Sequence, residues 1–246
     1  MDIHFLNLDR RTDRQEQFLR HNSSIGTLSR ISATDGSQLD REQLVKDRVI
    51  EPDLAHFSPG AIGNAVSHYH FWQRCAAGTQ PVTIAEDDAV FNYGFAPAAD
   101  KVLQQLPAEW DIILWGFNFN SILHVGLFDG LNESVLHFSR SQLGDDQTAY
   151  QRRTIHPTPL RLVNAFGLVC YSISPGGARR LLERCFPLCN ELVSVPGLKA
   201  EIHNMTLDTE MNRHFGSLEA FVCFPPLVWT ENDRTQSDVC SEAISD

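Results

Sequence analysis

The 246-residue sequence lacks several features that would assign it to a class of protein at once. No uninterrupted apolar run approaches the roughly 18–20 residues that a membrane-spanning helix needs. Basic residues are scarce, because 20 Lys and Arg stand against 31 Asp and Glu, a formal net charge of −11. Neutralising phosphates needs concentrated Lys and Arg, so we expect no nucleic-acid binding and no attachment to an anionic membrane by charge alone.

Targeting signals and familiar cofactor motifs are also missing. The segment Met1–Asn7 has no basic stretch followed by an apolar one, so we expect no signal peptide and a cytoplasmic protein. The six cysteines form no C-x-x-C pair, and we expect reduced thiols. Cys185 and Cys189 leave a zinc site as the minor alternative to buried apolar residues. There is no Walker A loop, no G-x-G-x-x-G loop and no internal repeat.

Short apolar segments alternate with helical ones over the first two thirds of the chain. The apolar segments predict strands at residues 3–8, 25–33, 81–85, 111–117, 166–173 and 220–224. The intervening patterns predict helices that end near residue 22 or span 37–49, 58–78, 95–106, 178–185 and 207–214. This alternation is typical of an α/β fold with a mainly parallel central sheet flanked by helices on both faces.

The remaining segments set the domain prediction. Residues 118–161 have weak periodicity, so we expect an irregular, functional insertion there. We predict one domain over residues 1–230 and a loose polar tail at 231–246. Polar clusters follow three predicted strands, at 9–14, 33–36 and 86–88. Ligands of such sheets bind beyond the carboxyl ends of the strands, so these clusters are the candidate site.

The acidic triplet Glu86, Asp87 and Asp88 is the most informative of these clusters. Side chains alternate along a strand, so we expect Glu86 and Asp88 to point the same way and Asp87 the other. Two carboxylates that converge at a strand end suit a hard divalent cation such as Mn²⁺ or Mg²⁺. A solvated loop, or a cap for the following helix, is an equally good interpretation of the triplet by itself.

A metal does not define the reaction. Arg10, Arg11 and Arg14 beside a cation would suit a diphosphate, and an exposed helical face is the alternative for them. A haloacid dehalogenase-type phosphatase needs a second Asp two residues after the first, and Asp9 is followed by Arg10 and Arg11. A different metal-dependent phosphohydrolase built on the triplet stays open.

Several separated segments carry motifs that point further. They are Asn-Leu-x-Arg-Arg-x-x-Arg at 7–14, Ala-x-Asp-Gly at 33–36, Gly-x-x-Gly-x-x-x-Ser-His at 60–68, Glu-Asp-Asp at 86–88, the strand and small-residue turn at 166–178, and the shorter landmarks at 207–208 and 225–228. In this order and spacing they resemble glycosyltransferase family 25, the lipooligosaccharide and procollagen galactosyltransferase-like group. Asn64 stands where that family usually has Cys, a change that we expect to affect packing and not chemistry.

The resemblance implies a GT-A type fold with a nucleotide-sugar half at about 1–117 and an acceptor half at about 118–230. It implies a metal-dependent, inverting transfer of a hexose, galactose in our prediction, from a UDP-sugar to a glycan or glycolipid acceptor. The expected setting is the biosynthesis of lipopolysaccharide, lipooligosaccharide or a related surface polysaccharide. Peripheral contact with the inner membrane and the oligomeric state stay open. A catalytically silent relative that binds nucleotide or glycan is a further alternative.

The resemblance also implies roles for individual residues. Glu86 and Asp88 would hold Mn²⁺ or Mg²⁺, Asp87 would face the ribose or the donor sugar and act in catalysis, and Asp208 would be the catalytic base or an extra metal contact. The expected nucleotide-sugar-binding residues are Asn7, Asp9, Arg10, Arg11, Arg14, Ala33, Asp35, Ser67, His68 and Asp87. Ser67 and His68 are adjacent on a predicted helix, so they cannot act as a Ser–His nucleophilic pair.

Overall fold

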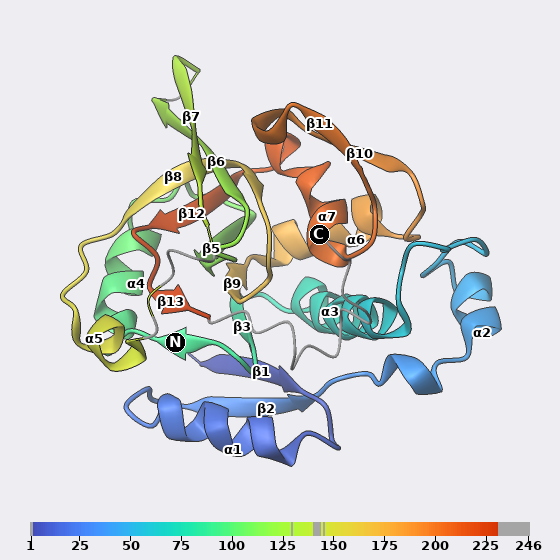
Figure 1. Cartoon of the computed structure of the whole chain (residues 1–246), viewed down its shortest axis with the longest axis horizontal. Helices are drawn as coiled ribbons and strands as arrows, with labels where there is room; N and C mark the ends of the chain where they lie inside the picture. Colours follow the sequence, from blue (N-terminus) through green and yellow to red (C-terminus); the bar gives the residue numbers. More distant parts are fainter. Residues whose placement is uncertain (1, 129, 140–143, 145, 231–246) are drawn as a thin grey trace.

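The central element is a nine-stranded sheet in the computed structural model, which describes residues 2–128, 130–139, 144 and 146–230 (Figure 1). The strands lie in the order β2-β1-β3-β9-β5-β12-β8-β6-β7. Along the chain they are β1 (Ile3–Asn7), β2 (Leu28–Ser32), β3 (Val82–Glu86), β5 (Ile112–Gly116), β6 (Ile122–Phe128), β7 (Asn132–His137), β8 (Thr158–Ala165), β9 (Cys170–Ile173) and β12 (Ala220–Phe224). Two small sheets pair β4 (Val90–Phe91) with β13 (Val228–Trp229) and β10 (Leu192–Val195) with β11 (Ala200–His203).

The central sheet is mixed, and the prediction of a mainly parallel sheet is wrong. β1 runs parallel to β2 and β3, and β5 runs parallel to β12, but β9 lies antiparallel between β3 and β5. β8, β6 and β7 extend the sheet through antiparallel pairs. β9 is a fully buried apolar run, and such a run indicates a buried strand without fixing its direction.

Helices cover both faces of the sheet, as the alternation of elements predicts. α3 (Pro59–Ala77), α6 (Pro175–Cys185) and α7 (Leu207–Asn212) contribute to the core on one face, and α1 (Thr12–His21) and α4 (Phe95–Leu103) to the core on the other. Side chains of β5 alternate accordingly: Ile112 and Leu114 join the first core, and Ile113 and Trp115 the second. The sheet therefore separates two apolar layers.

The start of α3 is built as the sequence predicts and fixes one wall of the later site. Ser58 is the N-cap, and its side chain accepts a hydrogen bond from the backbone N–H of Ala61 at 3.0 Å. One turn further on, a Cβ on Gly63 would lie 2.6 Å from the carbonyl oxygen of Thr34. Glycine at this position lets the helix touch the backbone of residues 34–36 directly. Ser67 secures the contact, because its hydroxyl accepts from the N–H of Thr34 at 2.8 Å.

Two segments differ from their prediction. Residues 118–161 are not an irregular insertion but hold β6, β7, the start of β8 and α5 (Gln147–Arg152). Only three residues separate β6 from β7, and a link this short joins antiparallel strands. The expected helix at 37–49 is a 3₁₀ turn (Gly36–Gln38) followed by α2 (Arg41–Lys46). Weak periodicity therefore concealed the strands and helix at 118–161. The pattern at 37–49 predicted a longer helix than the structure contains.

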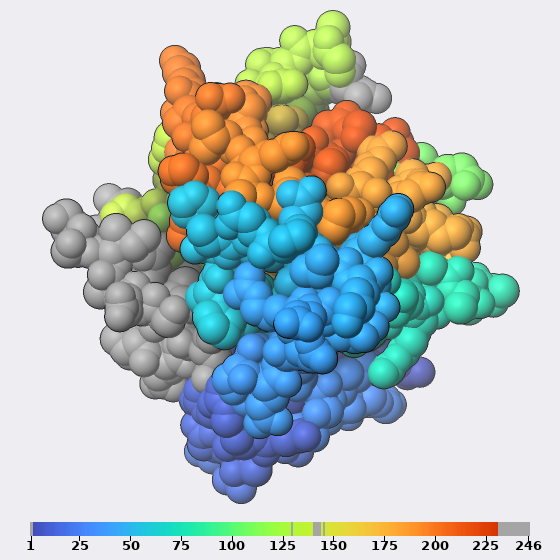
Figure 2. Space-filling model, turned by 90° about the vertical axis from the view of Figure 1, so that its right-hand side faces the viewer, coloured from blue at the N-terminus to red at the C-terminus, as the bar shows by residue number. Residues whose placement is uncertain are grey.

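The segment between α2 and α3 (residues 47–58) packs against a part of the chain that is distant in sequence, near Leu188. On the face shown in Figure 2, it lies between the N-terminal strands and the part of the chain around α6. Backbone hydrogen bonds hold it there, since Glu51 N–H donates to the carbonyl of Leu188 and Leu188 N–H donates to that of Val49. No helix among the described residues is long and apolar enough to span a bilayer. The predicted polar tail at 231–246 lies outside the described residues.

Candidate active site

A cleft of about 650 Å³ opens at the edge of the sheet where β1, β2 and β3 end. It gathers many of the predicted site residues from both halves of the chain. Those that line it are Asn7, Arg10, Arg14, Ala33, Asp35, Ser67, Glu86, Asp87, Asp88 and Asp208. Parallel strands bring their carboxyl ends to one edge, which is why three clusters distant in sequence meet here.

Glu86 ends β3 and lies on the cleft wall. Its Oε1 accepts a hydrogen bond from Asn64 Nδ2 at 3.2 Å. Burial and then the negative charge of Asp88 raise the pKa of Glu86 to about 8, with smaller repulsion from Asp208 and Asp87. Asn64 lines the same cleft, and its amide stabilises the charged form of Glu86. That the change from Cys to Asn leaves the chemistry unaffected stays a prediction.

Asp88 has one satisfied and one unsatisfied carboxylate oxygen. Thr230, one residue after β13, donates its hydroxyl proton to Asp88 Oδ2 at 2.9 Å. Asp88 Oδ1 is buried and has no hydrogen-bond partner among the described residues. Burying a carboxylate oxygen without a hydrogen-bond donor raises the free energy of the folded state unless a cation lies beside that oxygen. Asp88 is thus a carboxylate with one oxygen anchored and one free to bind a cation.

Asp87 faces a different set of groups from its two neighbours. Arg14 forms an ion pair with Asp87 Oδ1 at 2.5 Å, and Asn7 Nδ2 donates to Asp87 Oδ2 at 2.7 Å. Burial raises the pKa of Asp87, while Arg14 and Asn7 oppose that shift. Asn7 is itself buried and accepts at Oδ1 from Arg30 Nε at 2.9 Å. The chain from Arg30 through Asn7 to Asp87 therefore fixes the middle acid of the triplet.

The arginines near the cleft already have acidic partners. Arg10 pairs with Asp35 at 3.1 Å, and Arg11 pairs with Asp13 at 3.0 Å. Hydrogen bonds from Ser37, and then Arg10, lower the pKa of Asp35. Of the three predicted arginines, Arg10 and Arg14 line the cleft and Arg11 does not. Asp9, which is exposed and pairs with Arg30 at 2.5 Å, also lies off the cleft wall.

His68 is placed inside the core beneath the cleft. It is fully buried, and its Nδ1 lies 2.7 Å from the Tyr171 hydroxyl, which also accepts from Trp72 Nε1 at 2.7 Å. Its Nε2 has no partner among the described residues. Burial lowers the pKa of His68 to about 3, so the ring is neutral at physiological pH. His68 supports α3 against β9 and does not line the cleft.

This buried imidazole predicts a loss of stability in mild acid. The unfolded chain binds a proton at His68 below about pH 6.5, whereas the folded chain does so only near pH 3. Stability contributed by neutral His68 is therefore lost as pH falls, by about 2 kcal/mol between pH 7 and pH 5. Glu86, whose pKa is raised, contributes a pH dependence of the opposite sign in every variant that keeps it. Urea unfolding at both pH values should therefore show the His68 contribution as the difference between the natural chain and His68→Gln. An equal pH dependence in the two proteins would contradict the assignment.

Asp208 enters the cleft from the opposite half of the chain. It lies in the first turn of α7, where its Oδ2 accepts from the backbone N–H of Gly167 at 2.7 Å. Its Oδ1 accepts from the N–H of Thr209 at 3.0 Å and from the Thr206 hydroxyl. Asp208 lines the same cleft as the triplet, and its charge contributes to the raised pKa of Glu86.

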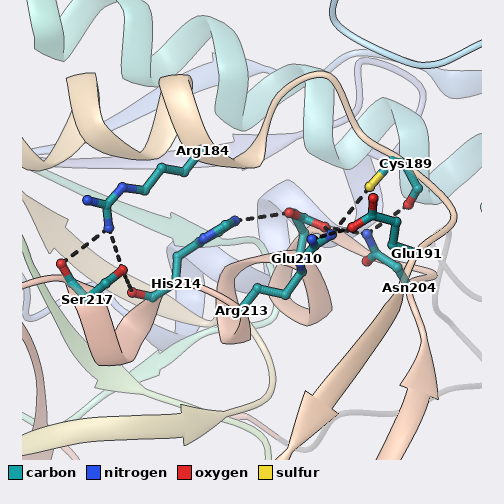
Figure 3. A network of polar contacts seen from close by, with 8 residues as sticks. All are labelled: Arg184, Cys189, Glu191, Asn204, Glu210, Arg213, His214 and Ser217. Carbon is teal, nitrogen blue, oxygen red and sulfur yellow. Dashed lines mark hydrogen bonds and ion pairs between the residues drawn. The ribbon is translucent and has the colours of Figure 1, made fainter.

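A polar network holds α7, and with it Asp208, in place (Figure 3). Buried Glu210 lies between His214 Nε2 at 3.0 Å, Arg213 Nη1 at 3.5 Å and the Asn204 amide. On the other side of the helix, Asn212 exchanges two hydrogen bonds with the backbone of Ala165, at 2.7 and 3.0 Å. Six residues of helix would be marginal without tertiary support, so these contacts determine where Asp208 points.

The residues present fit a divalent cation with few protein ligands. No three His, Cys, Asp or Glu side chains of the described residues are grouped as a metal-ligand set. Mg²⁺ and similar ions, however, are commonly held by one or two carboxylates together with water and substrate phosphates. Glu86 and Asp88 meet that requirement, because the two acids repel each other and Asp88 Oδ1 has no partner among the described residues.

The cysteines form no comparable centre among the described residues. Cys75, Cys170, Cys185, Cys189 and Cys223 are free thiols. Cys185 is buried, and Cys189 accepts from Arg213 Nη1 at 3.3 Å. Cys240 lies outside the described residues.

Comparison with known proteins assigns the family. Residues 1–192 match the model of glycosyltransferase family 25, described as an LPS biosynthesis protein. The chain is 34% identical over 126 residues to a glycosyltransferase 25 family member of Anopheles gambiae, and 30% over 128 residues to procollagen galactosyltransferase 1 of Danio rerio. These matches cover 46% and 47% of this chain but only 21% of each relative. This chain belongs to glycosyltransferase family 25.

A distant structural likeness adds nothing to this assignment. The structure of mannose-1-phosphate geranyltransferase from Thermus thermophilus is 11% identical, with 90% of this chain and 72% of that chain covered. Its TM-score is 0.34.

Proposed function

We propose that the protein is a metal-dependent, inverting glycosyltransferase that moves a hexose, galactose, from its UDP-sugar to a glycan or glycolipid acceptor. The observation that carries this proposal is that Glu86, Asp88, Arg10, Arg14 and Asp208 line one cleft. Within it, Asp88 Oδ1 is buried without a hydrogen-bond partner among the described residues. The proposed pathway is the synthesis of lipopolysaccharide, lipooligosaccharide or a related surface polysaccharide. A cytoplasmic location with peripheral contact at the inner membrane belongs to the same proposal.

Glu86 and Asp88 are the residues that would hold Mn²⁺ or Mg²⁺. When bound, the ion supplies Lewis-acid stabilisation of the diphosphate leaving group. Arg10 and Arg14 add positive charge on the same side of the cleft, and a guanidinium can hydrogen-bond phosphate oxygens in pairs. Their bonds to Asp35 and Asp87 hold them in position, so little side-chain freedom is lost when the donor binds.

Asp87 and the wall formed by residues 33–37 would orient the nucleotide-sugar. Asn7 and Arg14 hold both oxygens of Asp87, which keeps the carboxylate directed at a fixed point of the cleft. Ala33 and Asp35 lie in the turn that follows β2, the strand next to β1. Ser67 of α3 hydrogen-bonds to this turn at Thr34. A donor lying along this edge would place its diphosphate beside Glu86 and Asp88.

Asp208 would remove the proton from the attacking hydroxyl. Inversion in a single displacement requires a base on the acceptor side of the anomeric carbon. The hydroxyl oxygen forms the new bond to that carbon while the bond to UDP breaks, and the proton passes to the carboxylate. Three hydrogen bonds from Gly167, Thr206 and Thr209 hold Asp208 for this step.

A nucleotide panel tests the proposal directly. Thermal unfolding is measured with UDP, GDP, CDP and ADP, each with and without Mn²⁺. We expect UDP to raise Tm only when Mn²⁺ is present, and release of UDP from a UDP-hexose in the presence of glycan acceptors. No metal-dependent stabilisation by any nucleoside diphosphate would refute the proposed transferase. Binding of UDP without its release from any UDP-sugar would indicate a catalytically silent relative.

Thr230 gives a further prediction, because its hydroxyl donates to Asp88 and so anchors this carboxylate. Thr230→Val keeps the shape of the side chain but removes the donor, so Asp88 can rotate. We expect the Mn²⁺ concentration that gives half of the UDP-dependent rise in Tm to increase by about 10–100-fold. Thr230→Ser should restore it.

Thr83→Val is the matched control for Thr230→Val. Thr83 is also buried, and its hydroxyl hydrogen-bonds to Ser172 at 2.6 Å, away from the triplet. This variant should lose stability without changing the Mn²⁺ response. If both valine variants shift the Mn²⁺ midpoint equally, the effect of Thr230 is general destabilisation and its positioning role is refuted.

A further inference from the structure

Basic side chains and uncharged amide side chains line different parts of the cleft along one edge of the sheet. Among the described residues, every Arg, Lys or His that lines it belongs to residues 10–21. The loop that follows β5 lines the far end with Asn118, Asn120 and Ser121, which we call the amide patch. β3 and β9 lie between β1 and β5 in the sheet, so the two ends are three strand spacings, about 14 Å, apart.

The amide patch offers hydrogen-bonding groups that the protein leaves unused. The side chains of Asn118 and Asn120 are half-buried and form no hydrogen bond with any other described residue. Each amide provides two donor protons and one acceptor oxygen. A half-buried amide that the fold leaves unpaired is available to a ligand with both donor and acceptor groups, and a sugar hydroxyl is such a group.

Gly167 fixes Asn118 beside the candidate base. Gly167 has φ of +88°, and a Cβ at this position would lie 2.3 Å from Asn118 Oδ1. The Asn118 amide therefore packs directly on the Gly167 backbone. The N–H of the same glycine donates to Asp208 at 2.7 Å. One residue thus links the amide patch to the carboxylate that would take the acceptor proton.

We infer that the amide patch binds the acceptor as an uncharged, hydroxyl-bearing sugar, an inference that rests on the proposed transferase function. Asn118 and Asn120 hydrogen-bond the hydroxyls that flank the attacking one, and Phe166, which also lines the cleft, provides an apolar surface for the ring. The proton of the attacking hydroxyl goes to Asp208. An acidic sugar would find no cation at this end of the described cleft and would be repelled by Asp208 and the triplet.

Matched pairs of methyl glycosides test the inference. Methyl β-D-glucoside and methyl β-D-galactoside are compared with their glucuronide and galacturonide, which differ only by a carboxylate at C6. Binding is followed by saturation-transfer NMR on the full chain with UDP and diamagnetic Mg²⁺. We expect at least one neutral glycoside to bind, with an affinity about tenfold or more above that of its acidic partner.

Variants assign the binding to the amide patch. Asn118→Ala should lower the affinity for the neutral glycoside by about three- to tenfold, and Asn120→Ala should lower it as well. Asn132→Ala, an exposed asparagine of β7, is the matched control and should change nothing. The metal-dependent rise in Tm with UDP should stay the same in all three.

The outcomes separate this inference from the proposed function. Equal binding of acidic and neutral glycosides, no binding of any neutral glycoside, or full binding by both Asn118→Ala and Asn120→Ala would each overturn the inference while UDP still stabilises the protein. Loss of the metal-dependent UDP response in the unmodified chain would instead overturn the proposed transferase.

Discussion

Asp88→Asn should abolish the metal-dependent stabilisation by UDP and lower the rate of sugar transfer by about 10³-fold. The substitution keeps the size of the side chain and an oxygen that can accept from Thr230. It replaces the anionic oxygen that now lies buried and unpartnered among the described residues. The remaining carboxylate, Glu86, would hold the cation by itself. Thermal unfolding with UDP and a Mn²⁺ titration, followed by an assay of UDP release, measures both effects.

The control for this variant is a carboxylate outside the cleft. Asp100 lies exposed on α4, and Asp100→Asn removes the same charge without touching the cleft. It should leave both the Mn²⁺ response and turnover unchanged. Unchanged turnover in Asp88→Asn would refute the assignment of the metal site. A loss of cooperative unfolding in that variant would show that Asp88 serves the fold.

The charges around the triplet explain why these effects should be large. Burial and the neighbouring acids raise the pKa of Glu86 to about 8, so its charged form is disfavoured unless a cation is bound. Arg10 and Arg14 do not fully reverse the sign of the cleft, because each is paired with a carboxylate. In a protein with a net charge of −11, the proposed anionic donor would therefore bind here chiefly through the added ion.

Elements with local signals were predictable from the sequence. The Ser58-Pro59 start predicts α3, which begins at Pro59, because capping depends on residues within one turn. The run ending in Glu86 predicts β3, and the expected strand at Ala220–Phe224 is β12. The direction of β9 was not predictable, because periodicity is the same for both directions of a strand.

That direction matters for the site. Since β9 is antiparallel to β3 and β5, the loop that leads into it lies at the edge where those two strands end. Gly167 is in that loop and holds Asp208. A parallel β9 would instead bring the start of α6 to this edge. The mixed sheet is therefore the reason that Gly167 and Asp208, from the second half of the chain, line the same cleft as the acidic triplet.

The supporting residues of the site could not have been found from sequence spacing. Asn64 contacts Glu86 across 22 positions, Arg30 contacts Asn7 across 23, and Thr230 contacts Asp88 across 142. Arg30 and Thr230 are ordinary polar residues in their local segments, and the motif at 60–68 that contains Asn64 gives no sign of its contact with Glu86. Their roles depend on strand order, which places β2 beside β1 and β13 beside β4. The motif residues define the site, and the fold decides what orients them.

Asp208→Asn should lower turnover by about 10²–10⁴-fold, the usual contribution of a general base. Asparagine keeps the size of the side chain, and its oxygen can still accept from Gly167 or Thr206. The variant loses the ability to take a proton and one negative charge, which makes a minor contribution to the raised pKa of Glu86. If Asp208 is the base, the metal-dependent rise in Tm with UDP should be unchanged, and kcat should fall while the KM for the donor stays the same.

The same variant distinguishes the base from an extra metal contact, the other role considered for Asp208. A ligand of the cation would shift the Mn²⁺ midpoint together with the rate, as Asp88→Asn should. Asn212→Ala controls for position, because it loosens α7 by removing the two bonds to Ala165 and leaves the carboxylate in place. It should lower turnover less than Asp208→Asn does. Equal losses in the two variants would mean that the position of α7 limits the rate, and proton removal by Asp208 would then be refuted.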